Sequence, residues 1–198
     1  MLPRLSRQVP VLITMHDAWL LSGHCAHSFD CERWQTGCGM CPDLSIPPAI
    51  PADRTAENWR LKARIHSRSR LRIATPSGWL MQKVERSMLM PAVVERRVIP
   101  NGVDLATFAA RPGREAERAR LGLAADEFVV LFVANGIRGN VWKDVATLRA
   151  SLARLHVSLV PRRRVRMLAV GEDAPPERIG EALIEFVPHV DDAARLAS

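Results

Sequence analysis

Short apolar runs alternate with amphipathic segments along the chain, and this order predicts parallel strands that are joined by helices. Residues 11–15 form an apolar, β-rich run that ends in the polar pair His16 and Asp17. A buried parallel strand typically ends this way, because its carboxyl end opens into a loop at the functional edge of the sheet. Similar runs predict further strands at residues 71–75, 93–100, 128–134, 165–170 and 184–190.

Segments with the residue spacing of helices lie between these strands. Thr55 is suited to cap a helix over residues 53–70, and Ser77 is suited to cap one over 78–90. Shorter charged or capped segments predict helices at residues 113–121 and 191–198. A helix over residues 144–155 would turn four apolar side chains inward, namely Val145, Leu148, Leu152 and Leu155. Strand, helix and strand in this order predict right-handed parallel crossovers, and therefore an α/β fold.

The 198 residues are 47% hydrophobic, which is enough to bury a sizeable core in one large domain or two small ones. Pro100 and Gly102 end the strand at 93–100 and turn the chain toward a new unit. We therefore predict two partial Rossmann-like domains, over residues 1–110 and 111–198. A long irregular segment, residues 25–51, belongs to the first domain, and loops of this length are usually functional or locally cross-linked.

Hydropathy predicts where the protein lies in the cell, and charge predicts which partners it binds. No apolar run approaches the roughly 20 residues that span a bilayer, and residues 1–7 lack the apolar core of a secretion signal, so we expect a cytoplasmic protein.

The net charge of +7 comes from 25 Arg and 3 Lys. Two basic stretches, 60–72 and 162–166, fit either a solvated surface or contact with anionic lipid head groups. Neither has interleaved aromatic residues, which argues against a nucleic-acid partner.

The four thiols, at Cys25, Cys31, Cys38 and Cys41, lie within 17 residues. The two-residue gap between the last pair lets both sulfurs reach one metal, and a cytoplasmic cluster favours zinc. A structural zinc with these four ligands would hold the loop and perform no catalysis, since no coordination position stays open. His24 or His27 could replace one thiolate. Thiols without metal and redox-labile disulfides remain alternatives.

Four collinear motifs resemble family 4 glycosyltransferases, in particular bacterial members that build polysaccharides. They are TMHDAW at residues 14–19, GCGMCP at 37–42, TPSGW at 75–79 and IPNGVD at 99–104. The resemblance runs through nearly all of the chain and implies the GT-B fold, in which two Rossmann-like domains face a cleft. The early strands of the first domain and the later part of the second have no counterpart, so we expect a chain that is truncated at both ends.

The resemblance implies retaining transfer of a hexose, without a catalytic metal, from a UDP- or GDP-sugar to a polysaccharide or lipid-linked acceptor. Cations and oriented N–H groups must then stabilise the departing diphosphate. By position, this implies a donor site at Gly136, Arg138 and Lys143. It also implies that His16 faces the donor sugar, as the catalytic residue, across the cleft from Lys143. For Asp17 we expect a structural role. Glu177 and Glu185 have the spacing of the family's donor-binding pair, but Glu185 lies within a strand pattern, so we reject that pair.

Two other hypotheses about the function of the chain remain open on the sequence alone. The chain could be a non-enzymatic, zinc-stabilised interaction module whose basic stretches bind a polyanion, or an inactive remnant of a transferase. As a transferase, it could make peripheral contact through residues 60–72 with the inner face of the plasma membrane, where a lipid-linked acceptor would lie.

Overall fold

The computed structural model describes residues 1–109, 113–158 and 164–197, which form two compact units, Met1–Gly102 and Val103–Ser198. Each unit is built on a sheet with parallel strands and helices beside it, so the α/β prediction is confirmed. The domain boundary that we predict between residues 110 and 111 lies outside the described residues.

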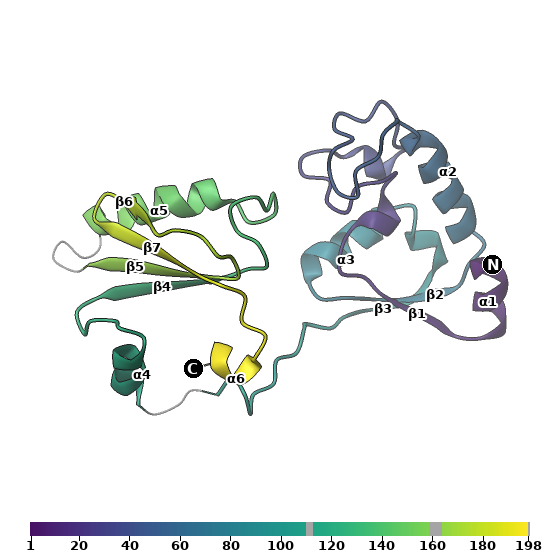
Figure 1. Cartoon of the computed structure of the whole chain (residues 1–198). Coiled ribbons are helices and arrows are strands. Elements are labelled where there is room, and N and C mark those ends of the chain that lie inside the picture. Colours follow the sequence, from purple (N-terminus) through teal and green to yellow (C-terminus); the bar gives the residue numbers. More distant parts are fainter. Residues whose placement is uncertain (110–112, 159–163, 198) are drawn as a thin grey trace. The chain divides into compact units, whose positions relative to one another are not determined.

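The first unit contains a parallel sheet of order β1-β2-β3 (Figure 1). Its strands are β1 (Val11–Thr14), β2 (Leu71–Thr75) and β3 (Val93–Val98). Pairing continues past the strands, since Met15 N–H donates to Ala74 O at 2.8 Å and Ile99 N–H donates to Thr75 O at 2.8 Å. All three strands therefore deliver their following loops to one carboxyl edge, as the alternation of strands and helices predicts.

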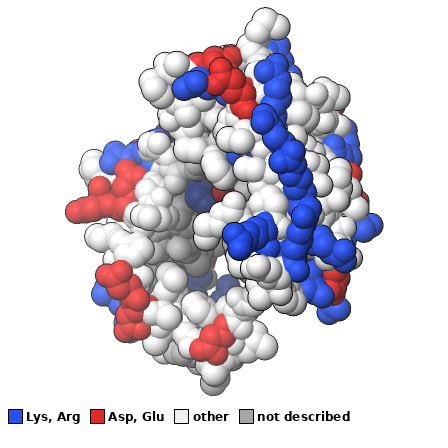
Figure 2. Space-filling view, turned by 90° about the vertical axis from the view of Figure 1, so that its right-hand side faces the viewer, with Lys and Arg blue, Asp and Glu red and all other residues white. Residues whose placement is uncertain are grey.

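Helices α2 (Thr55–His66) and α3 (Gly78–Glu85), with the cysteine-rich segment, lie on one side of this sheet (Figure 1). Leu71 and Ile73 of β2 pack there against Leu80 and Val84 of α3, and all four are at most 1% exposed. Each such side chain contributes about 1.5–3 kcal/mol by burial. Helix α1 (Leu2–Gln8) packs against α2. The side of this unit that carries α1 and α2 has a band of Lys and Arg side chains (Figure 2).

Several helix boundaries differ from the prediction, and α2 ends at His66 rather than at residue 70. Thr55 does not cap α2: the Asp53 carboxylate accepts from Thr55 N–H at 3.0 Å and from its hydroxyl at 2.6 Å, so Thr55 starts the helix. Helix α3 ends at Glu85 rather than at residue 90. The Ser87 hydroxyl donates to Val84 O at 2.8 Å and accepts from Leu89 N–H at 3.1 Å, which competes with further helical backbone bonds, and a 3₁₀ turn (Met90–Ala92) follows. The predicted Ser77 cap is confirmed, since its hydroxyl accepts from Leu80 N–H at 3.3 Å.

The second unit contains a sheet of order β4-β5-β7-β6 (Figure 1). Strands β4 (Phe128–Val133), β5 (Val165–Val170) and β7 (Ala182–Val187) are parallel, and the unpredicted β6 (Glu177–Ile179) is antiparallel to β7. The last strand therefore begins two residues before the predicted 184–190. Helix α5 (Val145–Ser158) covers one face, with Leu152 only 2% exposed. Two shorter helices are α4 (Arg114–Arg120) and α6 (Ala193–Leu196). Within the described residues, no helix is long and apolar enough to cross a membrane.

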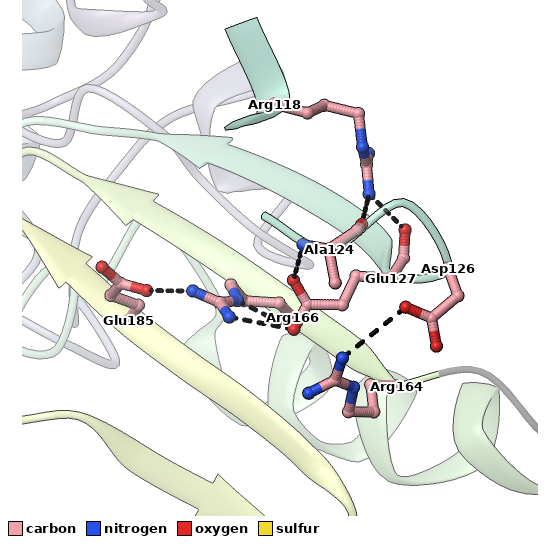
Figure 3. Close-up of polar contacts among 7 residues, drawn as sticks. All are labelled: Arg118, Ala124, Asp126, Glu127, Arg164, Arg166 and Glu185. Carbon is pink, nitrogen blue, oxygen red and sulfur yellow. Dashed lines mark hydrogen bonds and ion pairs between the residues drawn. The ribbon is translucent and has the colours of Figure 1, made fainter. Parts of the chain in front are cut away.

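An arginine on β5 ties neighbouring strands together (Figure 3). The Arg166 guanidinium bonds to Glu127 at 2.9 Å on one side and to Glu185 of β7 at 3.0 Å on the other. Burial of Glu127 opposes its ionisation, but the bonds from Arg166 outweigh this effect and lower the pKa of that carboxyl. A guanidinium nitrogen of Arg164 lies 3.6 Å from a carboxylate oxygen of Asp126 and forms an ion pair with it. The described arginines of the basic stretch 162–166 are thus paired with acids, while residues 162 and 163 lie outside the described part of the chain.

Candidate functional site

The carboxyl edge of the second sheet holds the loop between β4 and α5 close to the end of β5. Ala134 N–H donates to Val170 O at 3.0 Å, and Gly136 N–H donates to Gly171 O at 3.2 Å. Gly171 has a φ of 117°, and a Cβ at this position would lie 1.8 Å from Ala134 O. Only glycine therefore permits this approach of the two backbones, which fixes the start of the loop.

The Glu172 carboxylate fastens the next part of the loop. It accepts from Ile137 N–H at 2.6 Å, from Arg138 N–H at 2.8 Å and from Arg138 Nε at 2.5 Å. These bonds, led by the Arg138 backbone N–H, lower the pKa of Glu172 from its ordinary 4.5 to about 2. A carboxylate held by two successive backbone N–H groups and a guanidinium shows that this turn of the loop suits an anion.

Arg138 is the most constrained of the predicted donor-site residues. Its Nε bonds to Glu172, and its guanidinium carbon lies 5.3 Å from the centroid of the Phe186 ring. The side chain remains 40% exposed. Its two terminal nitrogens have no hydrogen-bond partner among the described residues, so they stay available to an external oxyanion.

Lys143 lies at the end of the same loop, directly before α5. Its backbone N–H donates to Asn140 O at 3.0 Å, and the exposed ammonium has no bonded partner in the described part of the chain. Asp144 follows with a φ of 37° and accepts from Thr147 N–H at 3.2 Å, which starts the helix. The structure thus brings Gly136, Arg138 and Lys143 together on one loop.

The first unit presents His16 at the carboxyl edge of its own sheet, where it is exposed and two residues after the end of β1. Asp17 accepts from Trp19 N–H at 2.8 Å, in keeping with the structural role expected for it. His16 and Lys143 belong to different units, and their meeting across a cleft stays a prediction.

Lys62 is a buried cation that the sequence analysis did not single out. Its Nζ donates to Trp19 O at 2.6 Å and to Ser22 O at 3.1 Å, and it lies 3.5 Å from the centroid of the Trp19 ring. Burial lowers the pKa of Lys62 to about 8. It fixes the loop after His16 to α2. The available signal was its position three residues after Trp59 and four before His66, which places the three side chains on one face of a helix.

The cysteine-rich segment gathers its four thiols around one small cavity of about 20 Å³, roughly the space of one water. All four cysteines are free. Burial raises the pKa of Cys25, and it raises that of Cys38 to about 11. The buried His24 joins them, with its Nε2 3.4 Å from Cys41 Sγ. His27, the other proposed substitute ligand, stacks on Trp79 at 5.3 Å.

These donors match zinc in chemistry, because thiolate and imidazole are its usual structural ligands. Among the described residues, however, no three His, Cys, Asp or Glu side chains are arranged to hold a metal ion as they stand. Zinc binding would require the thiols to lose their protons and draw together. The zinc site with Cys25, Cys31, Cys38 and Cys41 therefore stays a prediction.

Neither member of the rejected carboxylate pair is available as a ligand group. Glu177 on β6 makes a bidentate ion pair with Arg149 of α5, with bonds of 2.7–3.0 Å. Glu185 on β7 pairs with Arg166. Both carboxylates thus connect elements of the second unit.

Comparison with known proteins relates the chain to glycosyltransferases over part of its length. It is 33% identical over 105 residues to WcaC of Escherichia coli (strain K12), which is named as a colanic acid biosynthesis glycosyl transferase; the match covers 51% of this chain and 25% of WcaC. It is 46% identical over 74 residues to a D-inositol 3-phosphate glycosyltransferase of Kineococcus radiotolerans, covering 37% of this chain and 17% of that protein. The matches thus span a quarter or less of the relatives' own lengths. No protein-family model matches the chain.

Replacement of Glu172 by glutamine tests the loop anchor through its pH dependence. Because the pKa of Glu172 is lower in the folded protein than its ordinary 4.5, the carboxylate stabilises the fold above that pH and this contribution is lost as pH falls toward about 2. We expect Glu172→Gln to speed amide hydrogen exchange in β4, β5 and β7 at neutral pH, and the difference from wild type to shrink between about pH 4.5 and 2.

Glu181→Gln is the matched control, since Glu181 is exposed in the turn before β7 and has no bonded partner among the described residues. Its exchange should follow wild type at every pH. A Glu172→Gln effect that stays constant across this pH range would contradict the assignment of the carboxylate as the anchor.

The zinc hypothesis predicts an equimolar amount of zinc in protein purified without chelators, because four thiolates in one loop bind this metal tightly. Cys38→Ser together with Cys41→Ser should remove the metal and loosen residues 25–51. Elemental analysis measures the zinc, and thiol titration of the wild-type protein after chelation should find four reactive groups. Zinc-free wild-type protein with four titratable thiols, or with disulfides by mass spectrometry, would refute the hypothesis.

Proposed function

We propose that the chain takes part in retaining transfer of a hexose from a nucleotide-sugar donor, as a GT-B glycosyltransferase or a portion of one. The loop between β4 and α5 supports this proposal most directly, because it carries two cations at the carboxyl edge of a parallel sheet. Ligands of open α/β sheets bind at this edge. The relationship to two glycosyltransferases supports the same reaction class.

Lys143 is the group that would meet the donor diphosphate. Charge builds up on this leaving group as the bond to the sugar breaks, and a fixed cation lowers the energy of that state. The ammonium is exposed and has no bonded partner within the described residues, so binding a phosphate would break no existing ion pair. A UDP- or GDP-sugar would meet this requirement through the same diphosphate.

Arg138 would act beside it, with Glu172 as the residue that positions its guanidinium. The bond from Nε to Glu172 and the contact with the Phe186 ring restrict the side chain, which reduces the ordering cost of binding. The two terminal nitrogens could then hold phosphate oxygens in bidentate fashion. Gly136, with a φ of 68°, starts the turn that directs the loop toward the edge.

For His16 we propose a role at the sugar, by hydrogen bonding and orientation. Its exposed position after β1, with no bonded partner among the described residues, leaves the imidazole available. The Lys62 ammonium beneath the following loop would keep that loop in place. The acceptor would be a growing polysaccharide or a lipid-linked glycan, and the chemistry would need no catalytic metal.

Donor binding by Lys143 is tested by thermal protection of the 198-residue chain. We expect a UDP- or GDP-sugar to raise the unfolding temperature of wild type, because ligand that binds only the folded state stabilises it. Lys143→Ala should cost about 2 kcal/mol of binding free energy, which is about a thirtyfold rise in the dissociation constant.

Arg178→Ala is the matched control, because it removes an exposed cation of β6 that has no bonded partner in the described part of the unit. It should bind the donor as wild type does. Equal loss of protection in both variants, or no protection of wild type by either sugar nucleotide, would refute the proposed donor site.

A further inference from the structure

The arginines of the first unit divide into two sets of equal size. Six of the twelve bond to a carboxylate or a backbone carbonyl; these are Arg33, Arg54, Arg72, Arg86, Arg96 and Arg97. The other six are exposed and pair with no carboxylate among the described residues; these are Arg4, Arg7, Arg60, Arg64, Arg68 and Arg70. The unpaired set belongs to α1, to α2 and to the residues that follow α2.

The unpaired arginines form one surface. Arg60, Arg64 and Arg68 recur every four residues, which places them along one side of α2 and its continuation. Helix α1 packs against α2, and the Arg70 N–H donates to the Ser6 hydroxyl at 3.1 Å, which holds the two segments together. Figure 2 shows a band of Lys and Arg side chains on the side of the unit that carries α1 and α2, with Asp and Glu side chains beside its upper end.

The segments that carry these arginines, residues 4–7 and 60–70, contain no acid of their own. The sequence has no Asp or Glu before Asp17, and none between Glu57 and Glu85. Like charges four residues apart on a helix repel one another, so the folded chain carries an electrostatic cost on this surface that an anionic partner would remove. Acidic residues of the unit instead pair with arginines of the bonded set, such as Arg54, Arg72 and Arg96.

Apolar side chains lie among these arginines. Leu5 of α1 is 41% exposed and Leu61 of α2 is 49% exposed, and Val9 follows α1 at 48%. The aromatic residue of α2, Trp59, is half-buried and donates its indole N–H to Trp34 O at 2.9 Å, so it offers no free ring for base stacking. Basic residues mixed with exposed aliphatic ones suit the head-group region of an anionic bilayer better than a nucleic acid.

We propose that this surface of α1 and α2 binds the face of a membrane rich in anionic phospholipid. The unpaired guanidinium groups would contact phosphate head groups, and the leucines and Val9 would enter the interface. This inference does not depend on the donor site, which lies in the other unit, so the two can fail separately.

Vesicle sedimentation with the 198-residue chain tests the proposal. We expect binding to vesicles of mixed phosphatidylcholine and phosphatidylglycerol, no binding to phosphatidylcholine alone, and weakening as salt rises from about 0.05 M to about 0.5 M. Each arginine near an anionic surface is worth about a fivefold change in partitioning. The triple variant Arg60→Gln, Arg64→Gln, Arg68→Gln should therefore bind about a hundredfold more weakly, and Arg4→Gln with Arg7→Gln, on the other helix, about twenty-fivefold.

The matched control replaces three acid-paired arginines of the same unit, as Arg54→Gln, Arg96→Gln and Arg97→Gln. It lowers the net charge by the same amount and should bind within about threefold of wild type. Equal weakening of both triple variants would show that net charge alone drives binding and would overturn the proposal, as would failure of wild type to bind anionic vesicles.

Competition by two soluble anions, inorganic phosphate and duplex DNA, distinguishes membrane binding from binding of a small anion or of a nucleic acid. Neither inorganic phosphate nor duplex DNA should displace the protein from vesicles at the same total phosphate concentration, because neither offers an apolar interface. Displacement by inorganic phosphate would identify a small-anion site instead, and tighter binding to DNA than to vesicles would identify a nucleic-acid surface. In addition, Leu5→Ser with Leu61→Ser should weaken binding to vesicles several-fold; unchanged binding would contradict insertion at the interface.

Discussion

The candidate donor site depends on one carboxylate. Glu172 closes the loop after β4 by accepting two successive backbone N–H groups and the Arg138 guanidinium, directly after the glycine that lets the two strand ends approach. With this anchor, Arg138 is restrained and Lys143 extends from the far end of the loop without a bonded partner among the described residues. The low pKa of Glu172, about 2, follows from the same bonds, so the anchor is fully charged at neutral pH.

The strands and the predicted site loop could be derived from the sequence because they depend on local patterns. The apolar run of β2 predicts its bounds to the residue, Ser77 is a cap as expected, and Glu185 lies in a strand as its surroundings indicate. Contacts between distant residues left no such signal. The Glu172 anchor joins residues 34 and 35 apart in sequence. The start of α2 was missed for a local reason, because the Asp53 carboxylate bonds to Thr55 through a side-chain geometry that periodicity does not encode.

Charge is distributed differently on the two units. In the second unit, the described arginines of the stretch 162–166 are paired with acids and join strands, as Arg166 does between Glu127 and Glu185. In the first unit, six arginines on α1, α2 and the following residues lack such partners. Two stretches of similar composition therefore have different roles: one is part of the fold, and the other offers an anionic partner a surface that is separate from the donor-site loop.

The most direct test of the account is a titration of the isotope-labelled chain with UDP or GDP, followed residue by residue through its amide NMR signals. The account predicts that the largest shifts occur at Gly136, Arg138 and Lys143, with residues 25–51 of the first unit little changed. Shifts confined to the first unit, or no shifts at saturating nucleotide, would contradict the claim that the Glu172-anchored loop binds the diphosphate.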